Sequence, residues 1–233
     1  MKLSIIIPAF NEEKTIAAIL RRVLAEKFPA DWKKEIIAVN DGSSDRTEEA
    51  ISPFREEIKY LRHETNLGKG AAVKSALEAA TGEAVIIQDA DLEYDPADIP
   101  ALIRKFENSG ADAVFGSRNI NPEKRGYSLY VLGVATLTAL INILYGSKLT
   151  DIYTGYKLIK TPVLKSLGLE SRGFEFEAEV TAKLLTQRAK IEEIPISYQP
   201  RKFHEGKKIR ASDGLCGLWT ILRIFTRSSR EAA

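Results

Sequence analysis

The sequence predicts an α/β fold in which a mostly parallel β-sheet carries helices on both faces. Short apolar runs alternate with segments of helical spacing through the first half of the chain, an order typical of parallel strands joined by crossover helices. Polar clusters directly follow three of these runs. Finally, 44% of the 233 residues are hydrophobic and 28% are charged, as in soluble globular proteins.

Five short apolar runs predict the strands of this sheet. They are Leu3–Ile7, Glu35–Asn40, Ile58–His63, Ala84–Gln88 and Ala111–Ser117. Their short length and their many branched side chains are typical of buried strands. Ligands of such sheets bind beyond the carboxyl ends of the strands, so we expect the functional residues there.

The first two connecting segments are expected to form helices. Apolar residues at helical spacing cover 16–24, and Asn11 is positioned to cap this helix. Asp45 is followed three residues later by Glu48, a pair that resembles a capping box for the second helix.

Two further helices are expected in the first half. A glycine turn in the segment NLGKG, residues 66–70, leads into the third helix. The fourth covers 96–108, where Asp95 precedes Pro96 as a helix cap, since proline is favoured at the first helical position.

The second half begins with an apolar segment. Residues 126–147 form a run of 22 residues without a formal charge, which is long enough to cross a bilayer. The run also contains serine, threonine, asparagine and glycine. We therefore expect a helix that is buried or that lies on a membrane surface rather than a spanning helix.

The rest of the second half is expected to contain a polar turn with a short strand near 150–160, a helix at 174–188 and a strand at 191–199. Residues 215–225 combine aromatic and arginine side chains, a pattern of amphipathic interfacial helices. We predict one domain over residues 1–210 and a C-terminal interfacial helix over residues 211–233.

Composition narrows the class of protein. The net charge is +2, there is one cysteine, and there are two histidines. This composition indicates no nucleic-acid partner, no disulfide framework and no cysteine-based zinc site. The apolar run at the start is too short for a signal peptide, so we expect a cytoplasmic protein. Residues 201–230 contain eight Lys or Arg and two acidic residues, which suits an anionic ligand, a membrane surface or a solvated face.

The segment QDADLE, residues 88–93, predicts a cation site. Asp89 and Asp91 follow a buried strand, and Glu93 comes two residues later. Extended residues two apart share a face, so several carboxylates can converge on Mg²⁺ or Mn²⁺, which prefer oxygen ligands. An acidic turn at a helix entry is the alternative, and it explains Asp95 better than it explains Asp89 and Asp91.

Two other clusters suggest nucleotide binding. Asp41, at the end of the second strand, can accept hydrogen bonds from a nucleobase or ribose, and Gly42 allows close approach. Ordinary turn chemistry is the alternative reading of this cluster. Lys69 lies beside glycines at a helix N-terminus, which favours phosphate. The patterns of a Walker loop and of a dinucleotide-binding fingerprint are absent.

Several motifs together carry a family resemblance. In chain order they are IIIPAFNEE, VNDGSSDRT, NLGKGAA, QDADLEYDP, GSR, DIYTGYK and PRKFHEGKKI. They resemble, over roughly residues 1–210, the family-two glycosyltransferases, and in particular dolichyl-phosphate mannose or glucose synthases. The resemblance implies a GT-A fold, a nucleotide-sugar donor, a divalent cation (Mg²⁺ or Mn²⁺) and inversion at the anomeric carbon.

The resemblance also implies roles for individual positions. The nucleotide would be lined by Pro8, Phe10, Glu12, Val39 and Asp41. The ribose and sugar phosphate would face Asp89 and Ala90, and the cation would be held by Asp91 and Glu93. Two departures from the family pattern are Asn40, where Asp is frequent, and Phe10, where Tyr is frequent.

Basic residues complete the predicted site. The resemblance places Arg118, Arg201 and Lys207 against the donor diphosphate and the acceptor phosphate, since guanidinium groups bind phosphate well. Asp151 falls where related enzymes have an acidic group near the acceptor. Glu177 is a weaker candidate for the same role.

These observations lead to one expected reaction and two alternatives. We expect transfer of a hexose from GDP-mannose or UDP-glucose to a polyprenyl (dolichyl) phosphate, at the cytoplasmic face of a membrane, by a peripheral protein or with a membrane-protein partner. One alternative is transfer to a hydroxyl of a saccharide or protein, with Asp151 as the general base. The other is a non-catalytic nucleotide-sugar binding subunit.

Overall fold

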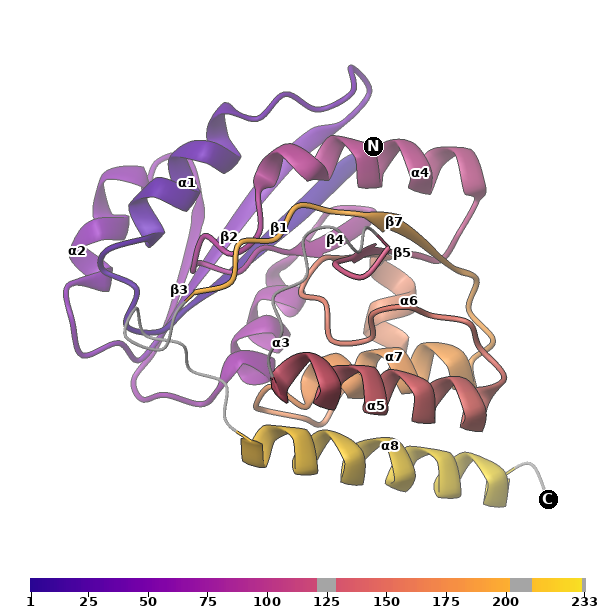
Figure 1. Cartoon of the computed structure of the whole chain (residues 1–233). Coiled ribbons are helices and arrows are strands. Elements are labelled where there is room, and N and C mark those ends of the chain that lie inside the picture. The colour runs from indigo at the N-terminus through magenta and orange to yellow at the C-terminus, as the bar shows by residue number, and fades with distance from the viewer. Residues whose placement is uncertain (121–128, 202–210, 232–233) are drawn as a thin grey trace.

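The computed structural model describes residues 1–120, 129–201 and 211–231 (Figure 1). One seven-stranded sheet of order β3-β2-β1-β4-β6-β5-β7 forms its centre. The strands are β1 (Lys2–Ala9), β2 (Lys33–Asp41), β3 (Lys59–His63), β4 (Ala84–Ile87), β5 (Ala113–Ser117), β6 (Lys157–Lys160) and β7 (Ile191–Pro195).

The prediction of a mostly parallel sheet is confirmed, with one strand that the sequence did not reveal as antiparallel. β1 pairs in parallel with β2 and β4, β2 with β3, and β5 with β7. β6 runs antiparallel between β4 and β5. Because β6 is reversed, its first residues lie at the edge where β4 ends. This places the segment before β6 beside the carboxylates that follow β4.

Helices cover both faces of the sheet (Figure 1). One face carries α1 (Ile16–Ala25), α2 (Thr47–Ile51) and α4 (Ile99–Ser109), with short 3₁₀ turns at Ser52–Phe54 and Pro96–Asp98. The other face carries α3 (Lys69–Ala79), α6 (Thr161–Ser166) and α7 (Phe176–Thr186). Two further helices, α5 (Leu129–Tyr145) and α8 (Ala211–Glu231), pack on α7.

The hydrophobic core consists of two layers separated by the sheet. Side chains alternate between the faces of a strand, so Leu3, Ile5 and Ile7 of β1 pack toward α1 and α4 while Ile6 packs toward α3. All four are fully buried. Burial on both faces explains why the strands are continuous apolar runs in the sequence.

The predicted helix caps are partly correct. Asp95 accepts a hydrogen bond from the N–H of Ala97 (3.1 Å), which confirms it as a cap. Asp45 accepts from the N–H of Thr47 at the start of α2 (3.0 Å). Glu48 does not close a capping box, because its carboxylate instead forms ion pairs with Arg55 and Arg62.

Asn11 does not cap α1, contrary to the prediction. The helix begins at Ile16, and Asn11 lies well before it with a left-handed φ of 50°. Its side-chain oxygen accepts from the N–H of Ser44 (2.9 Å). Asn11 therefore joins the loop after β1 to the loop after β2, which is a tertiary contact that helix periodicity does not encode.

The uncharged segment of the second half forms α5, which is partly buried. Leu137 and Ile141 face the core, whereas Leu132 and Ile143 are 65% and 80% exposed. Across the described residues, the search for a helix with the length and hydropathy of a membrane span found none.

The C-terminal helix α8 is amphipathic. Ile221 and Ile224 are buried against the core layer below the sheet, while Leu215 and Trp219 are exposed. The ring of Phe225 meets Tyr145 of α5 edge to face, with centroids 5.5 Å apart. The predicted division of the chain at residue 210 falls on residues 202–210, outside those described, and stays a prediction.

Candidate active site

Three loops meet at the carboxyl edge of the sheet, because β1, β2 and β4 are neighbours with parallel directions. The polar clusters of the sequence therefore lie side by side, as predicted. The N–H of Glu12, after β1, donates to Oγ1 of Thr47 at the start of α2 (2.8 Å). Cross-links of this kind hold the loops in one arrangement.

Asp41, the last residue of β2, holds the glycine loop of residues 66–70. Its carboxylate accepts hydrogen bonds from the N–H groups of Leu67 (3.0 Å) and Gly68 (2.8 Å). It also lies 2.7 Å from Nδ1 of His63. The carboxylate is thus committed to the loop, and the predicted contact of Asp41 with a nucleotide stays a prediction.

Gly42 permits a close approach, but the approaching group is the protein's own backbone. Its φ of +67° is a left-handed conformation that favours glycine. A Cβ at this position would lie 2.3 Å from the carbonyl carbon of Thr65. The glycine is therefore required to bring the loop after β2 against the loop after β3.

Asp91 and Glu93 lie after β4 and differ in their surroundings. Oε2 of Glu93 accepts from the hydroxyl of Tyr198 (2.6 Å), and Oε1 accepts from the N–H of Arg201 (2.7 Å). Asp91 accepts from the N–H of Glu93 (3.1 Å). Burial and the negative charges of Asp89 and Glu93 raise the pKa of Asp91 to about 7.

The guanidinium group of Arg201 bridges the loops after β1 and β4. Nε donates to the carbonyl oxygen of Asp91 (2.7 Å), while Nη2 and Nη1 lie 2.7 Å and 3.2 Å from the two carboxylate oxygens of Glu12. Glu12 is buried. The bidentate pair of Arg201 and Glu12 therefore borders the acidic residues after β4 on the side of β1.

The residues present fit a divalent cation held mainly by Asp91. A cation would favour the ionised form that burial and neighbouring charges disfavour. Within the described ranges no group of three or more His, Cys, Asp or Glu could form a complete metal cage. Mg²⁺ commonly takes one or two carboxylates and completes its shell with substrate phosphates. Each oxygen of Glu93 accepts one of the hydrogen bonds above, and an ionised carboxylate has about four lone-pair sites, so Glu93 can join Asp91 as a ligand.

Asp89 is paired with Lys69, and its side chain is 19% exposed. Oδ1 of Asp89 lies 2.7 Å from Nζ of Lys69, and Nζ also lies 3.0 Å from Oε1 of Glu177. Burial lowers the pKa of an ammonium group, but the two carboxylates outweigh burial and raise the pKa of Lys69. Lys69 therefore neutralises protein carboxylates in this structure, and its predicted contact with a phosphate stays a prediction.

Glu177 continues this chain of charges into the core. Its second oxygen, Oε2, lies 2.5 Å from Nζ of Lys157, the first residue of β6, and Lys157 also donates to the carbonyl oxygen of Thr154 (2.5 Å). Burial would raise the pKa of Glu177, but Lys157 and Lys69 outweigh it and lower that pKa. Glu177 is thus an ionised, buried carboxylate.

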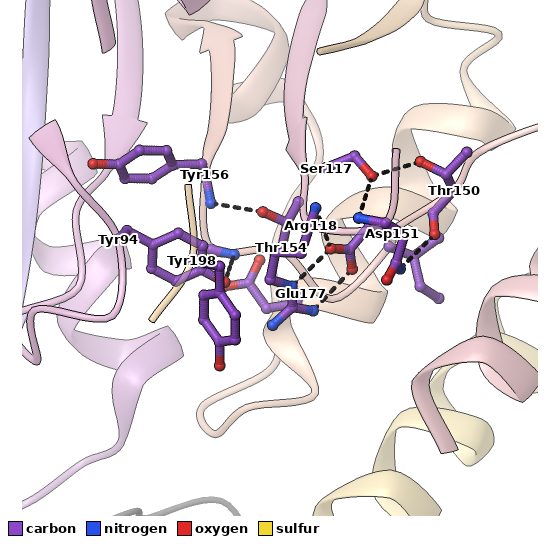
Figure 2. A network of polar contacts seen from close by, with 12 residues as sticks. Tyr94, Ser117, Arg118, Thr150, Asp151, Thr154, Tyr156, Glu177 and Tyr198 are labelled. Atoms are coloured by element: carbon purple, nitrogen blue, oxygen red, sulfur yellow. Dashed lines mark hydrogen bonds and ion pairs between the residues drawn. The ribbon is translucent and has the colours of Figure 1, made fainter. Parts of the chain in front are cut away.

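Arg118 and Asp151 form a bidentate ion pair (Figure 2). Nε of Arg118 lies 2.7 Å from Oδ2 of Asp151, and Nη2 lies 2.9 Å from Oδ1. Asp151 is fully buried. Burial alone would raise the pKa of Asp151, but the Arg118 guanidinium outweighs it and lowers that pKa. This carboxylate orients Arg118 and is poorly placed to take a proton from an acceptor.

Three tyrosines line the region between the two ion-pair systems. Tyr94 stacks on Tyr156 with centroids 4.9 Å apart and meets Tyr198 at 5.3 Å (Figure 2). The guanidinium carbon of Arg118 lies 5.0 Å from the ring centroid of Tyr198. The aromatic cluster therefore orients Arg118 from the side opposite Asp151.

The other residues that were predicted to line the nucleotide lie in strands β1 and β2 or in the loops directly after β1 and β4. Pro8 is in β1, Phe10 follows it, Val39 is buried in β2, and Ala90 is buried between the two aspartates. Asn40 is buried, and its side-chain nitrogen donates to the hydroxyl of Tyr60 (3.3 Å). Lys207 lies outside the described residues.

Sequence reasoning missed Lys157, Tyr94 and Tyr198 and underrated Glu177. The available signals were a lysine directly before an apolar strand, and a glutamate within the first turn of a helix. Neither pattern is specific, because charged residues at such positions usually face solvent. The antiparallel placement of β6 brings its first residue, Lys157, to Glu177.

Comparisons with known proteins agree with this arrangement. Residues 4–168 match the family model described as glycosyl transferase family 2. A protein of Methanocaldococcus jannaschii described as uncharacterized is 33% identical, and the match covers 83% of this chain and 86% of that protein.

Two relatives have named activities. A dolichol-phosphate mannosyltransferase of Pyrococcus furiosus is 27% identical over 89% of this chain. A dodecaprenyl-phosphate galacturonate synthase of Rhizobium johnstonii is 27% identical over 87% of this chain. The chain spans 59% and 60% of the lengths of these two relatives.

Solved structures show the same fold. A glucosyl-3-phosphoglycerate synthase of Mycobacterium tuberculosis, in complex with Mn²⁺, uridine diphosphate and glucosyl-3-phosphoglycerate, superposes with a TM-score of 0.74 at 20% identity. The match covers 97% of this chain and 80% of that one. A second structure of that enzyme contains Mg²⁺ and uridine diphosphate, with a TM-score of 0.75. The predicted GT-A fold is thereby confirmed.

Proposed function

We propose that this chain, which belongs to glycosyl transferase family 2, transfers a hexose from a nucleotide sugar to a polyprenyl phosphate. Relatives named for polyprenyl-phosphate products support the acceptor class. GDP-mannose and UDP-glucose are the donors that we propose to test first. The fold is shared with an enzyme crystallised with uridine diphosphate and Mn²⁺, which supports a nucleotide-sugar donor and a divalent cation.

The observation that carries the proposed acceptor is the state of Asp151. This carboxylate is fully buried, and both of its oxygens accept hydrogen bonds from Arg118. A hydroxyl acceptor needs a general base, and Asp151 was the candidate for it. A phosphate monoester carries a charge of about −1.5 to −2 at neutral pH and can attack without one. The ion pair therefore favours a phosphate acceptor.

The three carboxylates after β4 would bind the cation and the donor. When bound, a divalent cation would neutralise the donor diphosphate and the leaving nucleotide. Asp91 would hold that cation, with Glu93 as a second ligand, and Asp89 would face the ribose and the transferred sugar. The acceptor phosphate would attack the anomeric carbon from the opposite side to the leaving group, which inverts that centre.

Cationic side chains would bring the two phosphate-bearing substrates together. Asp151 accepts from Nε and Nη2 of Arg118, and a guanidinium has five N–H donors, so Nη1 can bind a phosphate oxygen. Arg201 would act from the side of Glu12, and we assign Lys207 the same role. These charges would offset the repulsion between acceptor phosphate and donor diphosphate.

A polyprenyl acceptor lies in a membrane, and we propose that α5 and α8 bring the site to its surface. Both helices expose large apolar residues, namely Leu132, Ile143, Leu215, Trp219 and Leu222. We will call these five residues the α5–α8 apolar surface. Trp is favoured at membrane–water interfaces. The protein would act peripherally at a cytoplasmic membrane face, alone or with a membrane-protein partner.

The test is a transfer assay with detergent-dispersed polyprenyl phosphate, Mn²⁺ and each radiolabelled nucleotide sugar in turn. We expect label in the lipid extract with one donor, and loss of at least about 100-fold in Asp91→Asn, which removes the proposed cation ligand. A thermal-shift screen with the same donors reports binding independently of turnover. Label that enters only saccharide or protein, or a donor that binds without being consumed, would overturn the proposal.

A further inference from the structure

We infer that Glu177 is a positioning residue that fixes the carboxylate of Asp89 from two sides. The inference rests on the proposed function, in which Asp89 faces the donor. Glu177 lies on α7 and is 3% exposed, so it cannot itself touch a donor in solution. Each of its two oxygens begins a chain of contacts, and both chains end at Asp89.

The first chain passes through Lys69. Oε1 of Glu177 lies 3.0 Å from Nζ of Lys69, and the same Nζ lies 2.7 Å from Oδ1 of Asp89. Lys69 is the first residue of α3, and the backbone before it is fixed by the hydrogen bond from Gly68 to Asp41. An ammonium group held by a second carboxylate has a defined position, so it also defines the position of Oδ1.

The second chain passes through Lys157 and the turn before β6. Oε2 of Glu177 lies 2.5 Å from Nζ of Lys157, which donates to the carbonyl oxygen of Thr154 (2.5 Å). The next residue, Gly155, lies against the other oxygen of Asp89: a Cβ built on Gly155 would be 2.6 Å from Oδ2. Asp89 is therefore confined between an ammonium group and a backbone.

Tyr94 supports the same turn from the opposite direction. Its hydroxyl oxygen accepts a hydrogen bond from the N–H of Gly155 (2.9 Å). The turn is thus held at Thr154 by Lys157 and at Gly155 by Tyr94. A turn fixed at two successive residues is a rigid wall for the Asp89 side chain.

The composition of this cluster points to positioning rather than to stability. Asp89, Lys69, Glu177 and Lys157 alternate in charge, and the side chains of the last three are 12%, 4% and 0% exposed. Buried ion pairs of this kind are often no more stabilising than apolar residues of similar volume. The hydrogen bonds of Lys157 to Glu177 and Thr154 are directional, whereas Lys69 meets both carboxylates as ion pairs, and Oε1 of Glu177 has no hydrogen-bond partner among the described residues. Misplacement of a reacting group by about 1 Å can cost about 100-fold in rate.

Two substitutions test the inference by different routes. Glu177→Gln removes the charge that holds both lysines. Gly155→Ala adds a methyl group against Oδ2 of Asp89 and introduces no buried charge; Gly155 has no positive φ, so the backbone accepts alanine. We expect each variant to lower kcat by about 100-fold with little change in the KM for the acceptor.

The matched control is Glu179→Gln, on the same helix. Glu179 is fully buried and paired with Lys183 (2.7 Å), and it accepts from the N–H groups of Glu170 and Ser171; none of these partners is Asp89, Lys69 or Lys157. It should retain kcat within about threefold. Lys69→Arg should recover part of the rate that Lys69→Met loses, since a guanidinium can still bridge two carboxylates.

A crystal structure of each variant supplies a readout that does not depend on turnover. We expect the Asp89 carboxylate to leave its present position in Glu177→Gln and in Gly155→Ala, and to stay in Glu179→Gln. Absence of lipid transfer by the wild-type protein would refute only the proposed acceptor. An unmoved Asp89 in both test variants, or a loss of kcat no greater than that of Glu179→Gln, would overturn the inference.

Discussion

At the scale of single residues, the Arg118–Asp151 pair separates two roles that the sequence left open. An exposed carboxylate at this position would be suited to accept a proton from a hydroxyl. A buried carboxylate with both oxygens bonded to a guanidinium is suited to orient it. The distinction depends on burial and partner, neither of which is visible in the motif DIYTGYK.

Asp151→Asn should lower the free energy of unfolding by about 3 kcal/mol, because removing one charge of a buried pair leaves the other uncompensated. Chemical denaturation measures this difference. The matched control is Asp112→Asn, whose partner Lys160 is 38% exposed; a partly exposed pair contributes about 0 to 1 kcal/mol. Equal losses in the two variants would contradict a buried, uncompensated Arg118.

The same pair predicts a dependence of stability on pH. The pKa of Asp151 is lowered in the folded protein, so its contribution is present above the unfolded pKa of about 4 and is lost as the pH falls through the folded pKa. Unfolding measured between about pH 6 and pH 3 should therefore be less pH-dependent in Asp151→Asn than in the wild-type protein. If the free energy of unfolding changes with pH in the same way in both proteins, Asp151 does not contribute to the pH dependence of stability.

At the scale of elements, the loop after β3 depends on a residue of the neighbouring strand. The N–H groups of Leu67 and Gly68 both donate to Asp41 of β2. Asp41 is adjacent to them because β2 and β3 are paired in parallel. The glycine loop that precedes α3 is therefore held by the sheet in addition to its own glycines, since Gly68 has a φ of 96°.

Asp41→Ala should loosen this loop without disturbing the sheet. Loss of a buried acceptor costs about 1 to 3 kcal/mol, so hydrogen exchange at the amides of Leu67 and Gly68 should accelerate by about tenfold or more. Mass spectrometry of peptides that cover 64–72 measures the change. As a control, the peptide that covers β1 should keep its wild-type protection; faster exchange there would mean general destabilisation.

The caps illustrate how far local patterns reach. Asp95 was predicted from a proline that follows it, and it caps the helix as expected. Asn11 matched an equally good local pattern, yet it bonds the loop after β2. Both residue types accept backbone N–H groups readily, and which N–H is nearest is decided by tertiary structure whenever two loops meet.

At the scale of the whole molecule, the α5–α8 apolar surface lies on helices stacked outside the core layer of α7 (Figure 1). The buried faces of both helices complete the core, through Ile141 of α5 and Ile221 of α8. Their outer faces keep large apolar side chains in contact with solvent.

Trp219→Glu should weaken binding to vesicles of phosphatidylcholine and phosphatidylglycerol by at least about tenfold, since transfer of a large apolar side chain contributes about 1.5 to 3 kcal/mol. Sedimentation with vesicles measures binding. Asn108→Glu is the matched control, because Asn108 is exposed on α4, across the sheet. A similar effect of both variants would indicate charge repulsion alone and would refute the proposed membrane surface.

The sequence by itself determined the fold class and the edge at which the site forms. Apolar runs and helical spacing are local patterns, and in a parallel sheet they imply that the polar clusters after β1, β2 and β4 share one edge. Asp89 and Asp91 were identified in this way, Glu12 and Arg201 by the family resemblance, and the structure brings all four to that edge.

Only the tertiary structure decided what each charged group does there. The reversal of β6 places Gly155, in the turn before it, against Asp89 and places Lys157 beside Glu177, while Lys69 of α3 links Asp89 to Glu177. These contacts join residues far apart in the chain. Local periodicity cannot specify them, because strand order and direction arise only when the helices and strands pack together.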